Sequence, residues 1–238
     1  MTTNTNVPLL RFKTFKEDWE NKKISEIAEV IGGGTPSTSN PNYWDGDINW
    51  YAPAEIGNKI YVDCSERKIT ELGLKSSSAK MLPADKTVLF TSRAGIGNTA
   101  ILRAPAATNQ GFQSMVVNDE TNPYFIYSMT EQIKEKAESV ASGSTFAEIS
   151  GKMLGNLDFM FPSFEEQVQI GNYFENIDNY MLYHQHKIET LIKLKKSMLL
   201  KLFPTNGANV PEIRFNGFTN HWDKSYPKLL LFLALLIQ

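Results

Sequence analysis

The chain has 238 residues, 42% of them hydrophobic and 21% charged, and its formal net charge is −2. These proportions are ordinary for a soluble globular protein with one good core plus an appendage, or with two small units. The single cysteine, Cys64, excludes an internal disulfide and a cysteine metal cluster, and it favours a reducing compartment. The opening MTTNTN lacks the basic-then-apolar pattern of a secretory signal, so we expect a cytoplasmic protein.

Residues 1–162 are predicted to form a mixed α/β globular domain, because strand-like runs, turn clusters and short helical stretches alternate along them. Residues 7–162 hold 16 Lys and Arg against 19 Asp and Glu, a net charge of −3. A protein that binds DNA unaided usually presents a basic surface to the phosphates. If this domain binds DNA, much of the positive charge has to come from a partner.

Two segments of this domain resemble enzyme motifs, and we expect both to be turns. Asn40–Tyr43 is similar to the Asn-Pro-Pro-Tyr signature of amino-methyltransferases, but its third residue differs and no glycine-rich cofactor loop precedes it. Gly95–Ala100 matches a dinucleotide-binding pattern, with Asp119 about 20 residues further on. That motif should open a helix, whereas the next residues, AILRAP, are strand-like and stop at Pro105.

Residues 163–204 are predicted to form a long spacer helix, with Glu165 and Glu166 in its first turn and lysines near its end. Positions spaced alternately by four and three residues form an apolar seam, as in a coiled coil. They are Ile170, Phe174, Ile177, Met181, His184, Ile188, Leu191, Lys195, Met198 and Leu202. Such a seam needs a second helix, so we expect the chain to form a homodimer through it.

His184 lies at the midpoint of this helix. In an antiparallel pair the two midpoints meet, and the two histidine rings would approach each other. We interpret His184 as a polar seam residue that fixes the register; a pH-sensitive dimer and a metal site are weaker alternatives.

Residues 205–238 follow a break at TNGAN and contain an internal repeat. The residues of the opening segment recur displaced by 203 positions: Val7-Pro8, Arg11-Phe12, Phe15 and Trp19 return as Val210-Pro211, Arg214-Phe215, Phe218 and Trp222. The repeat indicates two copies of one unit, of which the second is barely begun. The apolar tail is too short to span a bilayer, so we interpret it as a frameshifted or truncated end, with a peripheral membrane anchor as the alternative.

Motifs of glycine, small polar and aromatic residues recur along residues 7–203. They are Gly32–Ser37, Tyr43-Trp44, Ile48–Trp50, Leu89–Gly97, Thr108–Phe112, Ser142–Thr145, Ile149, Phe161-Pro162, Glu165–Gln167 and Leu191–Lys196. Together and in this order they resemble a target recognition domain and spacer helix of the DNA specificity subunits of type I restriction-modification systems.

The resemblance implies a non-catalytic subunit that reads DNA sequence. A full family member has two recognition domains, each reading half of a split site, and two antiparallel helices that space them. Two methyltransferase subunits bind alongside and carry S-adenosylmethionine, and a restriction translocase subunit can join. This chain holds one complete domain and one helix, so a homodimer would read an interrupted palindrome. The resemblance implies no cofactor and no metal on this chain, and no membrane partner.

We expect base contacts from hydrogen-bonding side chains on glycine-flanked loops, since such side chains reach into the major groove. The expected DNA-binding residues are Thr91, Ser92, Arg93, Asn109, Gln110, Ser142, Ser144, Thr145 and Lys152. For each of them a turn or capping role is the alternative. The span 75–103 carries five basic residues against Asp85, which predicts a local patch of net charge +4.

Two other classes of protein stay open at this point. One is a coiled-coil assembly protein or remnant that dimerises without binding DNA. The other is a stand-alone methyltransferase or nuclease, for which Asp45 and Asp47 with Lys59 are a faint candidate cluster. The three histidines all lie in the helix and the tail without a neighbouring cysteine, so their positions indicate neither a metal site nor a nucleophile–histidine pair.

Overall fold

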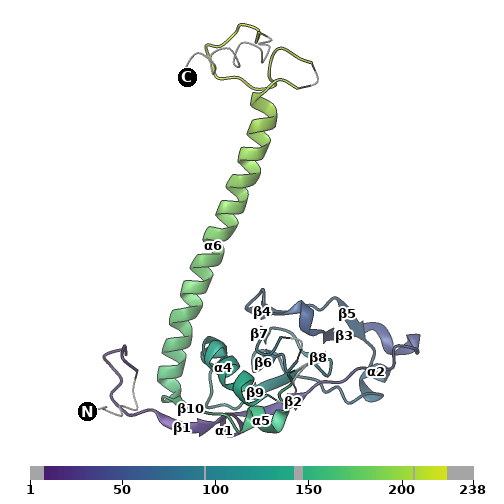
Figure 1. The fold of residues 1–238 in the computed structure, drawn as a ribbon, viewed down its shortest axis with the longest axis vertical. Coiled ribbons are helices and arrows are strands. Elements are labelled where there is room, and N and C mark those ends of the chain that lie inside the picture. The colour runs from purple at the N-terminus through teal and green to yellow at the C-terminus, as the bar shows by residue number, and fades with distance from the viewer. Residues whose placement is uncertain (1–7, 94, 142–146, 206, 224–238) are drawn as a thin grey trace, which may run out of the picture. The chain divides into compact units, whose positions relative to one another are not determined.

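The computed structural model describes residues 8–93, 95–141, 147–205 and 207–223. The chain divides into two units, residues 1–176 and 177–238, which we describe separately. The first unit contains three small sheets and five short helices and ends with the first turns of a long helix (Figure 1). The predicted mixed α/β class of the domain is therefore confirmed.

The largest sheet has five strands in the order β2-β9-β6-β7-β4. These strands are β2 (Ala28–Gly32), β9 (Gln113–Val117), β6 (Thr87–Phe90), β7 (Thr99–Leu102) and β4 (Tyr61–Val62). All neighbours are antiparallel except β4 and β7, which are parallel.

Two smaller sheets complete the domain. In the three-stranded sheet, β3 (Trp44–Tyr51) lies between β5 (Arg67–Ile69) and β8 (Ala106–Thr108), antiparallel to the first and parallel to the second. In the two-stranded sheet, β1 (Glu20–Lys23) pairs antiparallel with β10 (Asp158–Phe161). That last pairing brings the beginning and the end of the domain together.

The domain also has short helices, three of which begin at a polar residue whose side chain accepts a hydrogen bond from the first turn. The short helices are α1 (Ile24–Ile27), α2 (Glu71–Lys75), α3 (Pro123–Ser128), α4 (Thr130–Val140) and α5 (Gly151–Gly155), with 3₁₀ helices at Pro41–Tyr43 and Pro53–Glu55. The side chain of Asn40 accepts a hydrogen bond from the backbone N–H of Asn42. The turn predicted at residues 40–43 is thereby confirmed.

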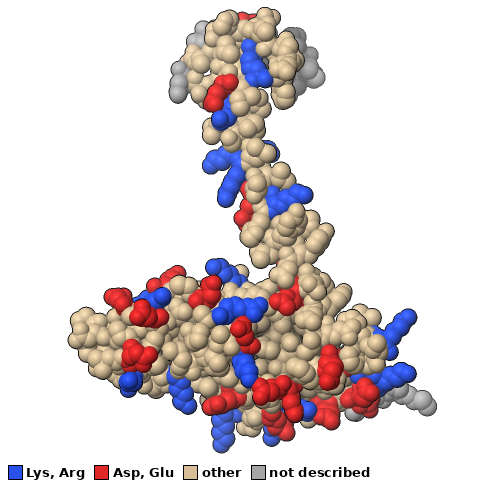
Figure 2. All heavy atoms as spheres, turned by 180° about the vertical axis from the view of Figure 1, so that it is seen from behind, with Lys and Arg blue, Asp and Glu red and all other residues tan. Residues whose placement is uncertain are grey.

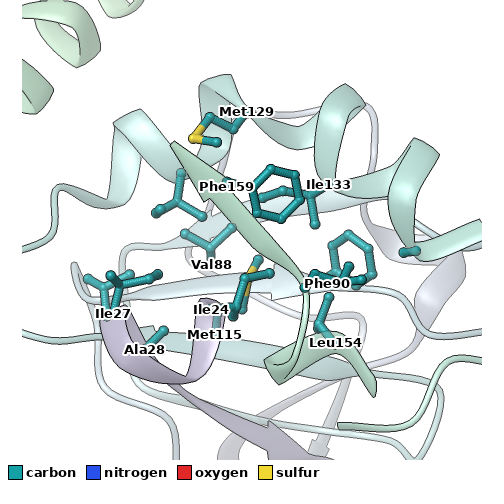
Figure 3. Packing of buried hydrophobic residues seen from close by; sticks show 14 of the residues in the cluster. Ile24, Ile27, Ala28, Val88, Phe90, Met115, Met129, Ile133, Leu154 and Phe159 are labelled. Atoms are coloured by element: carbon teal, nitrogen blue, oxygen red, sulfur yellow. The ribbon is translucent and has the colours of Figure 1, made fainter. Parts of the chain in front are cut away.

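The main hydrophobic core lies between the five-stranded sheet, the short helices and β10 (Figure 3). Val88 and Phe90 of β6 point into this core, while Leu89 between them joins a second cluster around Tyr51 and Phe112. The side chains of Val88, Leu89 and Phe90 are all fully buried, because successive residues of a strand point to opposite faces and both faces are covered. This strand therefore lies between two hydrophobic clusters of the domain.

The glycine motif at residues 95–100 forms the connection between β6 and β7. Gly95 and Gly97 have φ angles of +105° and +92°, in the left-handed region that favours glycine. The strand β7 follows directly at Thr99, where a dinucleotide-binding motif would open a helix. This confirms the prediction of a tight turn.

The long helix α6 spans Phe164–Leu202, 39 residues, close to the predicted bounds. At about 1.5 Å per residue its length is roughly 58 Å. Within the ranges that the structure describes, no helix is both long and apolar enough to cross a membrane. The apolar tail at 224–238 lies outside the described residues, so its interpretation stays a prediction.

Candidate nucleic-acid interface

Four loops of the globular domain converge at one place. In the loop after β6, the N–H of Ser92 donates to the carbonyl of Gly111 in the loop after β8 at 2.8 Å. The carbonyl of Ser92 accepts from Ile149, just before α5, at 3.0 Å. The N–H of Gly34, after β2, donates to Thr108 at 2.8 Å. Four motifs that are far apart in the sequence therefore support one another.

Two glycines allow these loops to approach so closely. A Cβ atom at Gly33 would lie 1.9 Å from the carbonyl oxygen of Asn109, which no side chain can tolerate. A Cβ atom at Gly111 would lie 2.8 Å from the ring of Pro53. Gly33 is therefore required by contact with a neighbouring backbone, and Gly111 by contact with a proline ring.

Thr91 and Ser92 do not lie on the surface, which corrects their expected role. Both are fully buried. The hydroxyl of Thr91 donates to the carbonyl of Gly95 and accepts from the N–H of Asn98 at 2.9 Å, so it braces the glycine turn. Buried side chains cannot reach base edges, so the candidate interface leaves them out.

Arg93 and Asn109 line a shared concavity of about 500 Å³, and this places two of the expected residues together. Glu148, Gly111 and the segment 52–54 complete its wall. Asn109 accepts a hydrogen bond from the N–H of Gly111 at 2.7 Å, which holds its side-chain oxygen and leaves the amide nitrogen as a donor. Arg93 is half-buried and has no ion pair among the described residues. The concavity thus offers amide and guanidinium donors beside a carboxylate acceptor.

Glu148 was not among the residues expected to contact DNA, because acidic side chains repel phosphates. A carboxylate can nevertheless accept a hydrogen bond from cytosine in the major groove. Its position one residue before Ile149, which bonds to the loop after β6, is what brings it to the concavity.

Of the remaining expected residues, the structure describes two. Gln110 is exposed, and its side chain is hydrogen-bonded by the hydroxyl of Thr35. Lys152 is exposed on α5, whose first turn is capped by Ser150. The other three lie outside the described residues: Ser142, Ser144 and Thr145.

The predicted +4 patch is partly neutralised, and this lowers the charge expected there. Lys86 pairs with Asp119, and this hydrogen bond holds the pKa of the Asp119 carboxyl below its usual value. Arg103 pairs with Asp85 at 2.9 Å and with Glu175 at 3.8 Å. On the face seen in Figure 2, acidic and basic side chains are interspersed over the globular domain.

The first turns of α6 are anchored to the domain by polar contacts. The buried carboxylate of Glu166 accepts two hydrogen bonds from the guanidinium of Arg11, at 2.8 and 2.7 Å. The side chain of Gln167 accepts from the N–H of Asn122 at 3.1 Å. Two turns later, Tyr61 donates its hydroxyl proton to Glu175, and burial together with this bond raises the pKa of the tyrosine.

The apolar seam of α6 is uncovered beyond those turns. Ile170 packs against the main core and is half-buried, and Met198 and Leu202 are half-buried as well. The seam residues between them are exposed by 38% to 62%: Phe174, Ile177, Met181, Ile188 and Leu191. An isolated helix with such a stripe leaves a large apolar area in water.

His184 sits in the middle of this exposed stripe between two aromatic rings. Its ring centroid lies 4.3 Å from that of Tyr180 and 5.3 Å from that of Tyr183. Its Nε2 atom is shielded from solvent and has no hydrogen-bond partner among the described residues. No group of three or more potential metal ligands occurs in the part of the chain that the structure describes.

Sequence comparison assigns most of the chain to a known family. Residues 16–194 match the type I restriction modification DNA specificity domain. The type I restriction enzyme MjaIX specificity subunit of Methanocaldococcus jannaschii is 37% identical over 191 residues, 79% of this chain and 44% of that protein. The EcoR124I/EcoR124II specificity subunit of Escherichia coli is 29% identical over 71% of this chain and 43% of that protein.

Solved structures share the fold over a similar range. The HsdS subunit from Thermoanaerobacter tengcongensis matches with a TM-score of 0.54 at 18% identity, over 78% of this chain and 44% of that one. The S subunit from M. genitalium matches with a TM-score of 0.56 at 18% identity, over 84% of this chain and 48% of that one. The chain spans less than half the length of these relatives. By its motifs, its fold and these matches, the chain belongs to the family of type I restriction-modification DNA specificity subunits.

Proposed function

We propose that residues 1–162 read one half of a split DNA site, and that α6 pairs with the same helix of a second copy to set the distance to the other half. The chain acts as a recognition subunit without chemistry of its own. Methyl transfer, with S-adenosylmethionine, and DNA cleavage belong to methyltransferase and restriction subunits that assemble on it.

The observation that carries the reading role is the concavity at the convergence of four loops. Its donors, Arg93 and Asn109, match the side chains that bind guanine and adenine edges. A carboxylate, Glu148, lies on the same wall. Gln110 and Lys152 are exposed on two of the converging segments, and we include them with Ser142, Ser144 and Thr145 in the proposed contact set.

The observation that favours pairing is the exposed seam of α6. Leu191 and its neighbours in the seam would bury most of their apolar surface against an identical stripe, at roughly 25 cal/mol per Å². An antiparallel pair centred on His184 is isologous, which is the usual symmetry of a dimer. Two domains at opposite ends of such a pair would read an interrupted palindrome.

The scarcity of free positive charge favours a composite DNA surface. With a net charge of −3 over residues 7–162 and its basic residues partly neutralised, the domain alone offers few phosphate contacts. We therefore expect methyltransferase subunits to supply most of the charge, and DNA affinity to be strong only in their presence.

A gel-shift selection from a randomised duplex pool tests this function. Three samples are compared: the chain alone, the chain with the cognate methyltransferase subunit, and that subunit alone. We expect enrichment of one interrupted palindrome only when both proteins are present. No enrichment in the combined sample would defeat the reading role and favour the alternative, a coiled-coil assembly protein without a nucleic-acid role.

A further inference from the structure

Two copies of one short motif occur in the chain, and they differ in what they contact. We call residues 8–19 the first motif and residues 211–222 the second motif. They share a proline, the Arg-Phe pair, a second phenylalanine and a tryptophan at equal spacing. This similarity of sequence raises the question of a similar binding surface.

The backbones of the two motifs are similar, although Gly217 has a φ of +96° and its counterpart, Thr14, does not have a positive φ. Their turns and bends fall at identical relative positions over all twelve residues. The N–H of Phe15 bonds to the carbonyl of Phe12 at 3.2 Å, and the N–H of Phe218 bonds to that of Phe215 at 3.3 Å. The two motifs therefore share the order of their turns and bends.

The first motif shows which surface fits this arrangement. The first motif and the start of α6 together line a groove of about 430 Å³, with Ile170, Tyr173 and Phe174 on the helix side. The guanidinium of Arg11 forms an ion pair with the buried carboxylate of Glu166. The ring of Phe12 meets Tyr173 edge-on, with centroids 6.0 Å apart. We call this surface the α6 groove.

The second motif has the same side chains without that surface. Phe215 and Phe218 are 72% and 68% exposed, whereas their counterparts in the first motif are half-buried. Arg214 makes no ion pair among the described residues. The motif is attached to the last turn of α6 by an ion pair of Lys201 with Glu212, at 3.0 Å.

Along the sequence, the α6 groove includes residues of the first turns of α6, whereas the second motif follows its last turn. Tyr173 and Leu202 are 29 residues apart on one helix, about 44 Å at 1.5 Å per residue. The second motif is bonded back to the far end of that helix, where the N–H of Ile213 donates to the carbonyl of Lys201. An antiparallel partner changes this: with His184 at the centre, Leu202 of one helix faces Glu166 of the other.

We propose that the second motif of one copy docks into the α6 groove of a second copy, where it exchanges with that copy's first motif. Arg214 then takes the place of Arg11 on the carboxylate of Glu166, and Phe215 takes the place of Phe12 against Tyr173. The exchange fastens each helix end to the recognition domain of the other copy. It rests on the proposed pairing of α6.

A photo-crosslink tests the contact directly in the full chain. Phe215 is replaced by benzoylphenylalanine and the protein is irradiated at a concentration where it is dimeric by light scattering. We expect a covalent dimer whose crosslinked peptides contain residues 166–174. The same replacement at His221, which lies in the second motif but is not shared with the first, is the matched control and should give little dimer. Crosslinks confined to one chain would overturn the exchange.

A double-mutant cycle tests the energetics, with Arg11→Ala, Arg214→Ala and the double variant compared by melting temperature and by mass. Exchange predicts that Arg214→Ala lowers the melting temperature more in the Arg11→Ala background than in the wild type, because each arginine can replace the other. If the two substitutions lower the melting temperature additively and the protein is a dimer, the exchange is overturned but the pairing of α6 is not. A monomeric wild-type chain would overturn the pairing of α6 and the exchange with it.

Discussion

The guanidinium of Arg11 holds the carboxylate of Glu166 across 155 positions of sequence, through two hydrogen bonds of 2.8 and 2.7 Å. The carboxylate is 1% exposed and the arginine side chain 14%. This pair joins the segment before the first strand to the first turn of α6.

Loss of this pair should destabilise the domain strongly. Glu166→Ala leaves the arginine without its partner in a largely buried site, and breaking a buried ion pair costs about 3–5 kcal/mol. Urea unfolding followed by circular dichroism measures the change. Glu165→Ala, at the exposed neighbouring position, is the control and should change the free energy of unfolding by less than about 0.5 kcal/mol. Equal losses of unfolding free energy at the two positions would contradict the stabilising role of the Arg11–Glu166 pair.

Gly33 should tolerate no side chain. Gly33→Ala places a methyl group 1.9 Å from the carbonyl oxygen of Asn109, so the loop after β8 must move, at a cost of about 1–3 kcal/mol or more. Gly32→Ala is the matched control, because its methyl group meets only the side chain of Gln113 at 3.4 Å. Thermal melting distinguishes the two variants. A melting temperature for Gly33→Ala equal to that of the control would show that the loops do not pack this way.

Polar substitutions in the seam should abolish dimerisation. Ile177→Asp with Ile188→Asp puts four carboxylates into a paired apolar seam, where unpaired charges are costly, and we expect a monomer by light scattering. Asn179→Asp with His186→Asp adds acidic residues on the opposite side of the helix and should leave the dimer intact. A wild-type mass for the seam variant would count against pairing through this face.

Arg93 should contribute to sequence discrimination. Arg93→Ala removes a donor from the concavity, and we expect binding to the selected site to weaken by about 1–3 kcal/mol while binding to unrelated DNA changes little. Lys80→Ala removes an exposed basic side chain elsewhere and would weaken binding to all sequences alike. Fluorescence anisotropy with the selected site and a scrambled duplex separates the two effects. Uniform weakening by Arg93→Ala would assign it to phosphate contact.

Much of the architecture could be predicted from local sequence. The seam of α6 repeats every three to four residues from Ile170 to Leu202, so its period alone predicts a helix with one apolar face. The turn after β6 was predictable because Gly95 and Gly97 are followed by a strand-like run that cannot continue as a helix. These features depend on neighbours in the sequence, which a single chain displays directly.

The positions of the functional side chains depended on contacts between distant segments. Thr91 and Arg93 are two residues apart in one motif, yet only the threonine is buried, because strand pairing places it under the loop after β8. The predicted +4 patch carries less net charge for the same reason: Asp119 and Glu175 lie outside residues 75–103 and pair with basic residues of that span. Sequence by itself determined the helix, its seam and the glycine turns, since each depends on nearby residues, and it determined the repeat, since identical residues recur at a constant displacement. Tertiary structure decided which polar groups remain free to bind, since burial and charge neutralisation are set by long-range packing.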